Sequence, residues 1–362
     1  MRKLFVILLA VSLLSCGTRG SLTKSGRSTS DTLYHNIYAS HFTLMGGGDT
    51  TILKVNNPWQ GAENVNKEFV ITKPLERVVC MSSSYVAFLA ELGLEDAIVG
   101  VSGLPFITNQ KVHQNNVKDV GYDKALNYEL ILGLRPDAVL VFEVAGENSA
   151  ITEKLRELGV PVIYIADYLE SSPLGKAEWL IAFGAMTGRL DEALEKFGQI
   201  EQRYENVRRE IAGSTGQYKP KVMLNSPYRD VWYVPGDRSY MVQLIRDAGG
   251  DYLAAGEDSE SSRPISVEVA YRLMAEADFW LNPSGSVQSI ADLKAADHRF
   301  AGMNVVRKEN VYSGDARSTP AGGSDFWESG TVRPDLVLSD LAKIFHPEAM
   351  ERYELCYYRR LQ

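Results

Sequence analysis

Residues 77–84 read Arg-Val-Val-Cys-Met-Ser-Ser-Ser, in which a short apolar run ends at three serines. An apolar run without polar alternation is typical of a strand that is buried on both faces, as in a parallel sheet. Residues 86–92 then show helical spacing that stops at Gly93, and a second strand pattern covers residues 97–101. This stretch therefore predicts a β-α-β unit, the building block of an α/β fold.

The alternation of strands and helices continues on both sides of one long helical segment. In the first half it predicts helices at 128–134 and 151–158 and strands at 138–142 and 162–165. In the second half the predicted elements are strands at 221–224 and 279–281 and helices at 241–247, 267–275 and 337–344. Between the halves, apolar residues recur three or four positions apart and define one buried helical stripe: Leu194, Phe197, Ile200, Tyr204, Val207 and Ile211.

We therefore predict two doubly wound α/β lobes. The lobes comprise residues 77–188 and 214–362, and one long rigid helix at 189–213 joins them. A single helical connector resists the wide hinge closure that flexible strands permit.

The N-terminus carries the features of a secretion signal. Arg2 and Lys3 precede an apolar run that is too short to span a bilayer, and the run ends at Leu-Leu-Ser-Cys16, which resembles a bacterial lipobox. We predict a signal peptide at 1–16, lipidation of Cys16 and a membrane anchor; an ordinary secretory peptide with an incidental cysteine is the alternative. The Gly- and Ser-rich residues that follow predict a flexible tether at 17–40.

Two further features of the N-terminal region concern its structure and the side of the membrane that the anchor faces. Residues 41–76 contain short β-like runs around Gly46-Gly47-Gly48, which predicts a β-hairpin extension. No acidic run follows Cys16. Because some Gram-negative bacteria send lipoproteins to the cell surface with such a run, we expect the anchor to face the periplasm.

Composition and motifs exclude several classes of function. The formal net charge of −8 leaves no basic footprint for nucleic acid. The five histidines have no metal-ligand spacing, so we predict neither a protein metal site nor a cofactor. No GxGxxG follows the first strand, and the chain has no GxxxxGK[ST] or GxSxG motif. We therefore predict a binding protein, with a lipoprotein hydrolase that uses one of Ser82–Ser84 as the alternative.

Cys80 and Cys356 remain after the predicted anchor. They could pair in an oxidising compartment, but we favour two unpaired thiols, because Cys80 lies in a strand-like apolar run and Cys356 near the C-terminus.

Several segments in register from about residue 77 to 347 resemble the iron-complex and cobalamin class of ABC-transporter substrate-binding proteins. Besides the opening strand, the segments that carry the resemblance are Glu91-Leu92-Gly93, Ile98-Val99-Gly100-Val101-Ser102, Val120-Gly121-Tyr122, Tyr128-Glu129, Leu134-Arg135-Pro136-Asp137-Ala138-Val139-Leu140, Pro235-Gly236, Ala248-Gly249-Gly250-Asp251-Tyr252, Ile265-Ser266-Val267-Glu268 and Leu341-Ala342-Lys343-Ile344-Phe345-His346-Pro347. One departure is Val86-Ala87, where the family often has Thr-Glu.

The resemblance implies that a ligand is held in a cleft between the two lobes. It also implies a periplasmic component that captures an iron complex, a siderophore or haem, and delivers it to an ABC permease and its ATPase. A cobamide is the alternative cargo, and a structural or sensory lipoprotein that has lost transport is a further alternative. The resemblance also implies one docking carboxylate per lobe for arginines of the permease. Glu268 matches the second-lobe position, and the first-lobe equivalent falls near Glu147, with Glu153 as a rival.

Candidate ligand contacts follow from the rule that doubly wound sheets bind ligands beyond the carboxyl ends of their strands. Aromatic rings there offer large contact area, and arginines suit an anionic chelate, which favours a ferric siderophore. The candidates are Tyr85, Phe106, Tyr122, Phe142, Arg229, Trp232, Tyr233, Arg263, Arg317 and Trp327. Phe142 could equally continue the strand into the core, the Tyr85 phenolate could reach a metal or simply pack, and each arginine could instead pair with a surface carboxylate.

Overall fold

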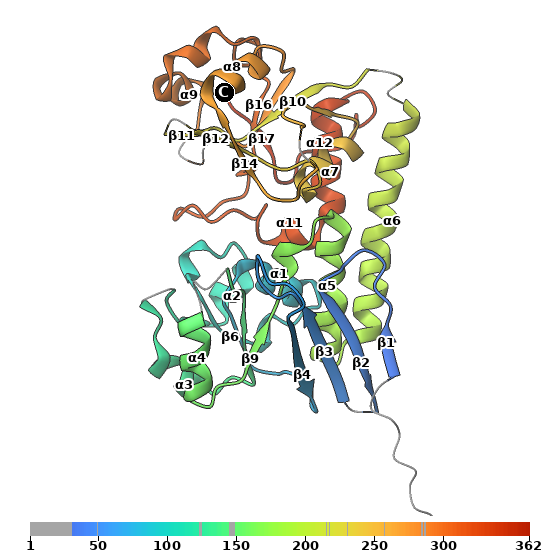
Figure 1. The fold of residues 1–362 in the computed structure, drawn as a ribbon, viewed down its shortest axis with the longest axis vertical. Helices are drawn as coiled ribbons and strands as arrows, with labels where there is room; N and C mark the ends of the chain where they lie inside the picture. Colours follow the sequence, from blue (N-terminus) through green and yellow to red (C-terminus); the bar gives the residue numbers. More distant parts are fainter. Residues whose placement is uncertain are drawn as a thin grey trace, which may run out of the picture.

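The chain folds into two α/β lobes at opposite ends of one long helix, α6 (Leu190–Ser214) (Figure 1). The computed structural model describes residues 31–48, 50–122, 125–144, 149–214, 216, 218–229, 231–256, 258–283, 285 and 287–362. The predicted signal peptide, Cys16 and Glu147 lie outside the described residues.

The N-terminal lobe is built on a five-stranded parallel sheet in the order β7-β6-β5-β8-β9. Its strands are β5 (Val78–Cys80), β6 (Ile98–Val101), β7 (Lys118–Asp119), β8 (Ala138–Val141) and β9 (Val162–Tyr164). The chain starts in the centre, at β5, and moves outward first to one side and then to the other. This order is that of a doubly wound sheet, whose switch point lies between β5 and β8.

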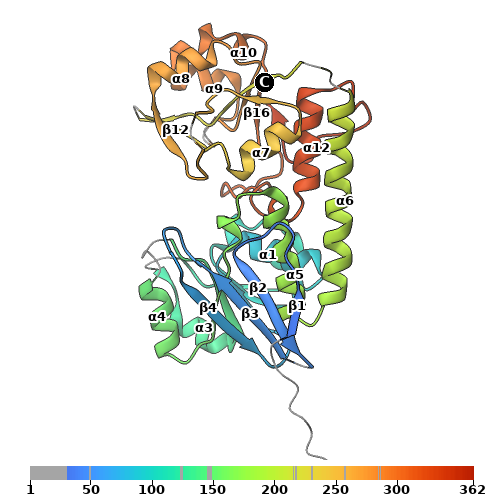
Figure 2. The ribbon, with the colours of Figure 1, turned by 45° about the vertical axis from the view of Figure 1, so that its right-hand side comes forward.

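Helices cover this sheet on both faces. They are α1 (Ser83–Glu91), α2 (Gln110–Gln114), α3 (Tyr128–Leu134), α4 (Ser149–Glu157) and α5 (Pro173–Met186). In Figure 2, α1 and α5 lie toward the C-terminal lobe and α3 and α4 lie away from it.

The C-terminal lobe has a second five-stranded sheet in the order β13-β10-β15-β16-β17, parallel except for the last strand, and a small antiparallel sheet β11-β12-β14. Its strands are β10 (Lys221–Leu224), β11 (Pro227–Tyr228), β12 (Val231–Val234), β13 (Asp251–Tyr252), β14 (Arg263–Ser266), β15 (Phe279–Leu281), β16 (Val311–Ser313) and β17 (Arg359–Arg360). Its helices are α7 (Tyr240–Asp247), α8 (Val267–Met274), α9 (Ile290–Ala296), α10 (Asn304–Arg307), α11 (Ser329–Val332) and α12 (Pro334–Phe345).

The N-terminal extension is a four-stranded antiparallel sheet rather than a hairpin alone. The hairpin is β2 (Phe42–Gly47) with β3 (Thr50–Asn56), and it is flanked by β1 (Asp31–Tyr34) and β4 (Asn66–Ile71). The prediction of a flexible tether is therefore wrong for residues 31–40, because this segment forms β1 and is then held to α5.

Two buried glutamates on and before α5 hold that segment. The Glu178 carboxylate is fully buried and accepts hydrogen bonds from Tyr34 Oη at 2.6 Å and from the backbone N–H groups of Ile37, Tyr38 and Ala39. Glu170 accepts the N–H groups of the next two residues, at 3.0 Å each, and the indole N–H of Trp179. These carboxylates replace the water that the backbone donors lose, as burial of a charge requires.

Helix α5 itself escaped sequence prediction. All of its residues are buried, so it has no polar face and no amphipathic period to reveal it.

Two other expectations can be compared with the described residues. Cys80 and Cys356 are free thiols, the first of them buried, in line with the predicted absence of a disulfide between them. Among the described residues, no helix is both long and apolar enough to cross a membrane.

We predict that Glu178→Ala lowers the free energy of unfolding by about 3–5 kcal/mol, because four donors lose a buried charged acceptor. Chemical denaturation of the variant measures this loss. Glu210→Ala, at an exposed position of α6, is the matched control and should change stability by less than about 0.5 kcal/mol. Equal, small effects of the two substitutions would contradict the role of Glu178.

Candidate functional site

The carboxyl ends of the N-terminal sheet face a cavity between the lobes, which we call the inner pocket. Its volume is about 330 Å³, at the small end of ligand pockets. The N-terminal lobe contributes the serines that follow β5 and the residues that follow β9, and the C-terminal lobe contributes aromatic rings. The lining residues are Ser82, Ser83, Ser84, Asp167, Tyr168, Pro173, Lys176, Tyr240, Leu244, Phe326, Trp327, Gly330, Thr331, Pro334 and Val337.

The inner pocket contains a buried cation and a buried carboxyl. Lys176, on α5, is only 8% exposed, and its Nζ donates to the backbone carbonyl of Asp167 at 2.9 Å. Burial lowers the pKa of Lys176, whereas the nearby carboxylates of Asp167 and Glu170 oppose that shift. Burial raises the pKa of Asp167, opposed first by the Lys176 charge. Each group therefore partly compensates for the other's loss of water.

Three serines open α1 at the edge of the inner pocket. Ser82 is the N-cap, and its hydroxyl accepts the N–H of Ser84 at 3.4 Å. The first turn of α1 has no acidic residue. The positive end of its helix dipole is therefore not neutralised by the helix itself.

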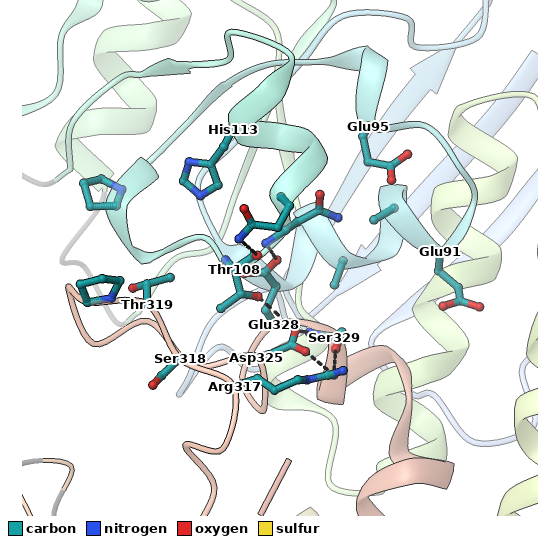
Figure 3. Close-up of a pocket in the computed structure, with 16 residues that line it drawn as sticks. Glu91, Glu95, Thr108, His113, Arg317, Ser318, Thr319, Asp325, Glu328 and Ser329 are labelled. Carbon is teal, nitrogen blue, oxygen red and sulfur yellow. Dashed lines mark hydrogen bonds and ion pairs between the residues drawn. The ribbon is translucent and has the colours of Figure 1, made fainter. Parts of the chain in front are cut away.

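A second interlobe space, which we call the outer groove, lies between α1, α2 and the loop that precedes α11 (Figure 3). Its volume is about 840 Å³. Here Glu328 joins the lobes: its carboxylate accepts the backbone N–H of Thr108 at 2.7 Å and that of Asn109 at 3.0 Å. Asp325 also crosses, accepting the Thr108 hydroxyl at 3.1 Å. We call these bonds the Glu328 latch.

Burial raises the pKa of Glu328, while its bonds to Thr108 lower it in part. Its side chain is almost fully buried. A buried carboxylate that accepts two N–H groups from the other lobe fixes the distance between the lobes.

Three of the predicted aromatic contacts, Trp327, Tyr122 and Phe142, line cavities. A fourth, Phe106, packs against the other lobe. Trp327 is 56% exposed and lines the inner pocket. Tyr122 and Phe142 line a smaller cavity of about 50 Å³ beside Met81 and Ser102. Phe106 is partly exposed, and its backbone packs so closely on Gly323 of the C-terminal lobe that a Cβ there would meet the Phe106 carbonyl oxygen at 1.9 Å.

Two predicted contacts are wrong, because the structure places them in the cores. Tyr85 is fully buried and its hydroxyl donates to the carbonyl of Ile165 at 3.3 Å. Trp232 is also fully buried; its indole N–H donates to Leu224 O at 2.8 Å. Neither side chain can contact a ligand or a metal. Tyr233, next along β12, is exposed.

The three predicted arginines do not converge on one site. Arg317 pairs with Asp325 in the outer groove and lies over the ring of Tyr357. Arg263 donates to the carbonyl of Ala254 at 2.6 Å. Arg229 lines a pocket of about 630 Å³ in the C-terminal lobe. The three arginines were predicted as ligand contacts whose number favours a ferric siderophore, and because they lie at three separate places they give that preference no joint support.

Of the two predicted docking carboxylates, the structure describes Glu268 and not Glu147. Glu268 is exposed in the first turn of α8 and lines the same pocket as Arg229. Its pKa is lowered by hydrogen bonds from its own N–H and from Ser266. Glu147 lies outside the described residues, and its rival Glu153 is exposed on α4.

Sequence reasoning missed Lys176 and Glu328. Lys176 stands in an otherwise apolar helix, where it and Glu178 are the two charged residues and were the available signal. Glu328 had no such signal. Within the ranges that the structure describes, no cluster of three or more His, Cys, Asp or Glu side chains suits a metal ion.

Comparison with known proteins gives consistent results. The family model described as periplasmic binding protein matches residues 78–318. An uncharacterised lipoprotein of Methanocaldococcus jannaschii is 27% identical over 295 residues, which cover 78% of this chain and 68% of the relative. A cobalamin-binding protein of Halobacterium salinarum is 28% identical over 205 residues, 56% of this chain and 53% of the relative.

Solved structures share the fold. A periplasmic haem-binding protein from Pseudomonas aeruginosa superposes with a TM-score of 0.60 at 21% identity, covering 80% of this chain and 98% of the other. The periplasmic vitamin B12-binding protein BtuF of Vibrio cholerae gives a TM-score of 0.52 at 17% identity, with 77% and 99% covered.

We predict that Glu328→Ala loosens the lobes. The amides of Thr108 and Asn109 each lose a hydrogen bond to a charged acceptor, worth about 1.5–3 kcal/mol, so their hydrogen exchange should accelerate at least about tenfold. Exchange measured by mass spectrometry or NMR reports this directly. Glu91→Ala, which removes a carboxylate from the same groove, is the control, and unchanged exchange in the Glu328 variant would rule out the latch.

Proposed function

This chain belongs to the periplasmic binding protein family, whose members bind substrates rather than transform them, and we propose that it captures a metal-bearing tetrapyrrole, haem or a cobamide, for an ABC importer. The observation that carries the proposal is the inner pocket, which the N-terminal lobe lines at the carboxyl ends of β5 and β9 and the C-terminal lobe lines with α7, α11, α12 and the loop before α11. Two of its aromatic residues, Trp327 and Tyr168, stay partly exposed and offer ring faces on which a flat, metal-bearing ring system could lie at the mouth of the pocket.

Several of the similar proteins are named for a tetrapyrrole, and one is named as a possible iron-binding protein. The relative from Halobacterium salinarum is named for cobalamin, and several structural neighbours are named for haem. Both molecules hold a metal within a macrocycle. The dispersion of the three arginines removes the observation that favoured a siderophore.

The membrane-anchored location is supported by relatives named as lipoproteins, from Methanocaldococcus jannaschii and Bacillus subtilis. With the lipobox-like sequence at Cys16, they support an extracytoplasmic chain that is tethered by lipid at that residue. We propose that the anchor holds the chain beside a permease and its ATPase in the periplasm. The family membership excludes the alternative of a hydrolase that uses Ser82–Ser84.

We predict that the purified chain binds haem or cobalamin with sub-micromolar to micromolar affinity and that binding quenches its tryptophan fluorescence. Trp327→Ala should raise the dissociation constant roughly three- to tenfold, because it removes an aromatic face from the pocket. Tyr218→Ala, an exposed aromatic elsewhere in the C-terminal lobe, is the control. Titration with haem, cobalamin and a ferric siderophore tests the proposal, and no saturable change with any of them would refute it.

We also predict that Glu268→Ala leaves ligand affinity unchanged and lowers uptake. A rim carboxylate that meets an arginine of the permease sets encounter and orientation more than ligand binding. Uptake of labelled ligand in cells is the measurement, with Glu348→Ala, another exposed carboxylate of this lobe, as the control. An equal loss of affinity and uptake would instead place Glu268 in ligand binding.

A further inference from the structure

We propose that the inner pocket is an anion subsite in which Lys176 and the serine-rich start of α1 bind a carboxylate or phosphate group of the ligand. The proposal rests on the proposed function, because it assigns a part of that ligand to a part of that cleft. It goes further by naming the ligand group and the residues that select it.

The ammonium group of Lys176 is only partly paired. An ammonium group has three N–H donors, and the structure accounts for one of them, the bond to the Asp167 carbonyl. The Nζ also lies 4.7 Å from the ring centroid of Tyr240. Among the described residues, no carboxylate oxygen lies within 4.0 Å of this Nζ.

A neighbour on the same helix shows what full compensation looks like. Glu178, two residues along α5, is fully buried and receives four donors from the N-terminal segment. Buried charges in folded proteins are normally paired and hydrogen-bonded in this way. Lys176 instead has N–H groups without a hydrogen-bond acceptor among the described residues, and it lines a cavity. A ligand oxygen in that cavity would complete its bonding.

The start of α1 adds a second positive element on the same cavity. The first turn of a helix presents N–H groups that lack partners within the helix. In α1, a side chain satisfies only the N–H of Ser84. The hydroxyls of Ser82 and Ser84 lie 3.0 Å apart. The Ser84 hydroxyl also hydrogen-bonds the Asp167 carboxyl, which leaves the Ser82 hydroxyl to turn toward an anion. Serine hydroxyls, helix amides and an ammonium are together the donors that bind carboxylate and phosphate.

The carboxyl of Asp167 also lines the inner pocket and must be part of the same account. As an anion it would repel a second anion. Burial raises the pKa of Asp167, and the Lys176 charge and a hydrogen bond from the Ser84 hydroxyl oppose this shift. A neutral Asp167 would leave the one cation of the pocket, Lys176, to one ligand anion.

The size of the inner pocket fits a side arm and not a whole macrocycle. About 330 Å³ is near the lower limit for a complete small ligand. The propionates of haem and the phosphodiester of a cobamide are anionic side groups that could enter while the ring lies at the mouth, against Trp327 and Tyr168. Both kinds of side group would present a negatively charged oxygen to Lys176.

Two pairs of probes test the subsite. Haem is compared with its neutral dimethyl ester, and cobinamide phosphate with cobinamide, which differs from it only in lacking the phosphate. The purified full-length chain should prefer the anionic member of one pair by about tenfold, the strength of one hydrogen bond between charged groups. Lys176→Met should abolish that preference while retaining affinity for the neutral probe, and Lys176→Arg should keep it. The preferred pair identifies carboxylate or phosphate as the bound group.

The other outcomes overturn the proposal in distinguishable ways. If the wild-type chain binds the probes without preference, the subsite is refuted and the proposed function stands. If Lys176→Met weakens binding of the neutral and the anionic probes equally, Lys176 is structural, and thermal unfolding of the variant should then show a loss as well. If the wild-type chain binds none of the four probes, the proposed function fails together with the subsite.

Discussion

The complete burial of α5 is the constraint on which the rest of the structure depends. All fourteen residues of this helix are buried, and it packs against α6, α1, α7, α11 and the strands β2 and β3. Both lobes and the N-terminal antiparallel sheet therefore contact the same helix, α5. Its two charged residues, Lys176 and Glu178, must find partners in that environment. One is satisfied by the N-terminal segment, and the other lines the cavity between the lobes.

The relation between the lobes follows from two connections of different kinds. Helix α6 spans them covalently, and α12 packs along it. The Glu328 latch closes the outer groove by hydrogen bonds. A helix cannot absorb a large change in backbone angles as a loop can. Helix α6 therefore resists movement between the lobes, whereas the hydrogen bonds of the latch can break and re-form.

The sequence predicted helices that are buried on one face and did not predict a helix that is buried on all faces. The long helix was found because Phe197, Ile200 and Tyr204 form a stripe, whereas α5 has no exposed face to create one. Tyr85 and Trp232 were placed in the cleft because they follow or border strands, but each side chain turns into a core. The arginines were grouped by their loops, and distance in space between those loops cannot be read from sequence. Buried carboxylates such as Glu178 and Glu328 leave no local pattern, because their partners lie far along the chain.

The most direct test of the account is a crystal structure of the chain grown with haem or with cobalamin. The account predicts a macrocycle at the mouth of the inner pocket, in contact with Trp327, with an anionic side arm within hydrogen-bonding distance of Lys176 Nζ. A ligand held in the C-terminal pocket beside Glu268, or in the outer groove, with the inner pocket unused, would contradict it.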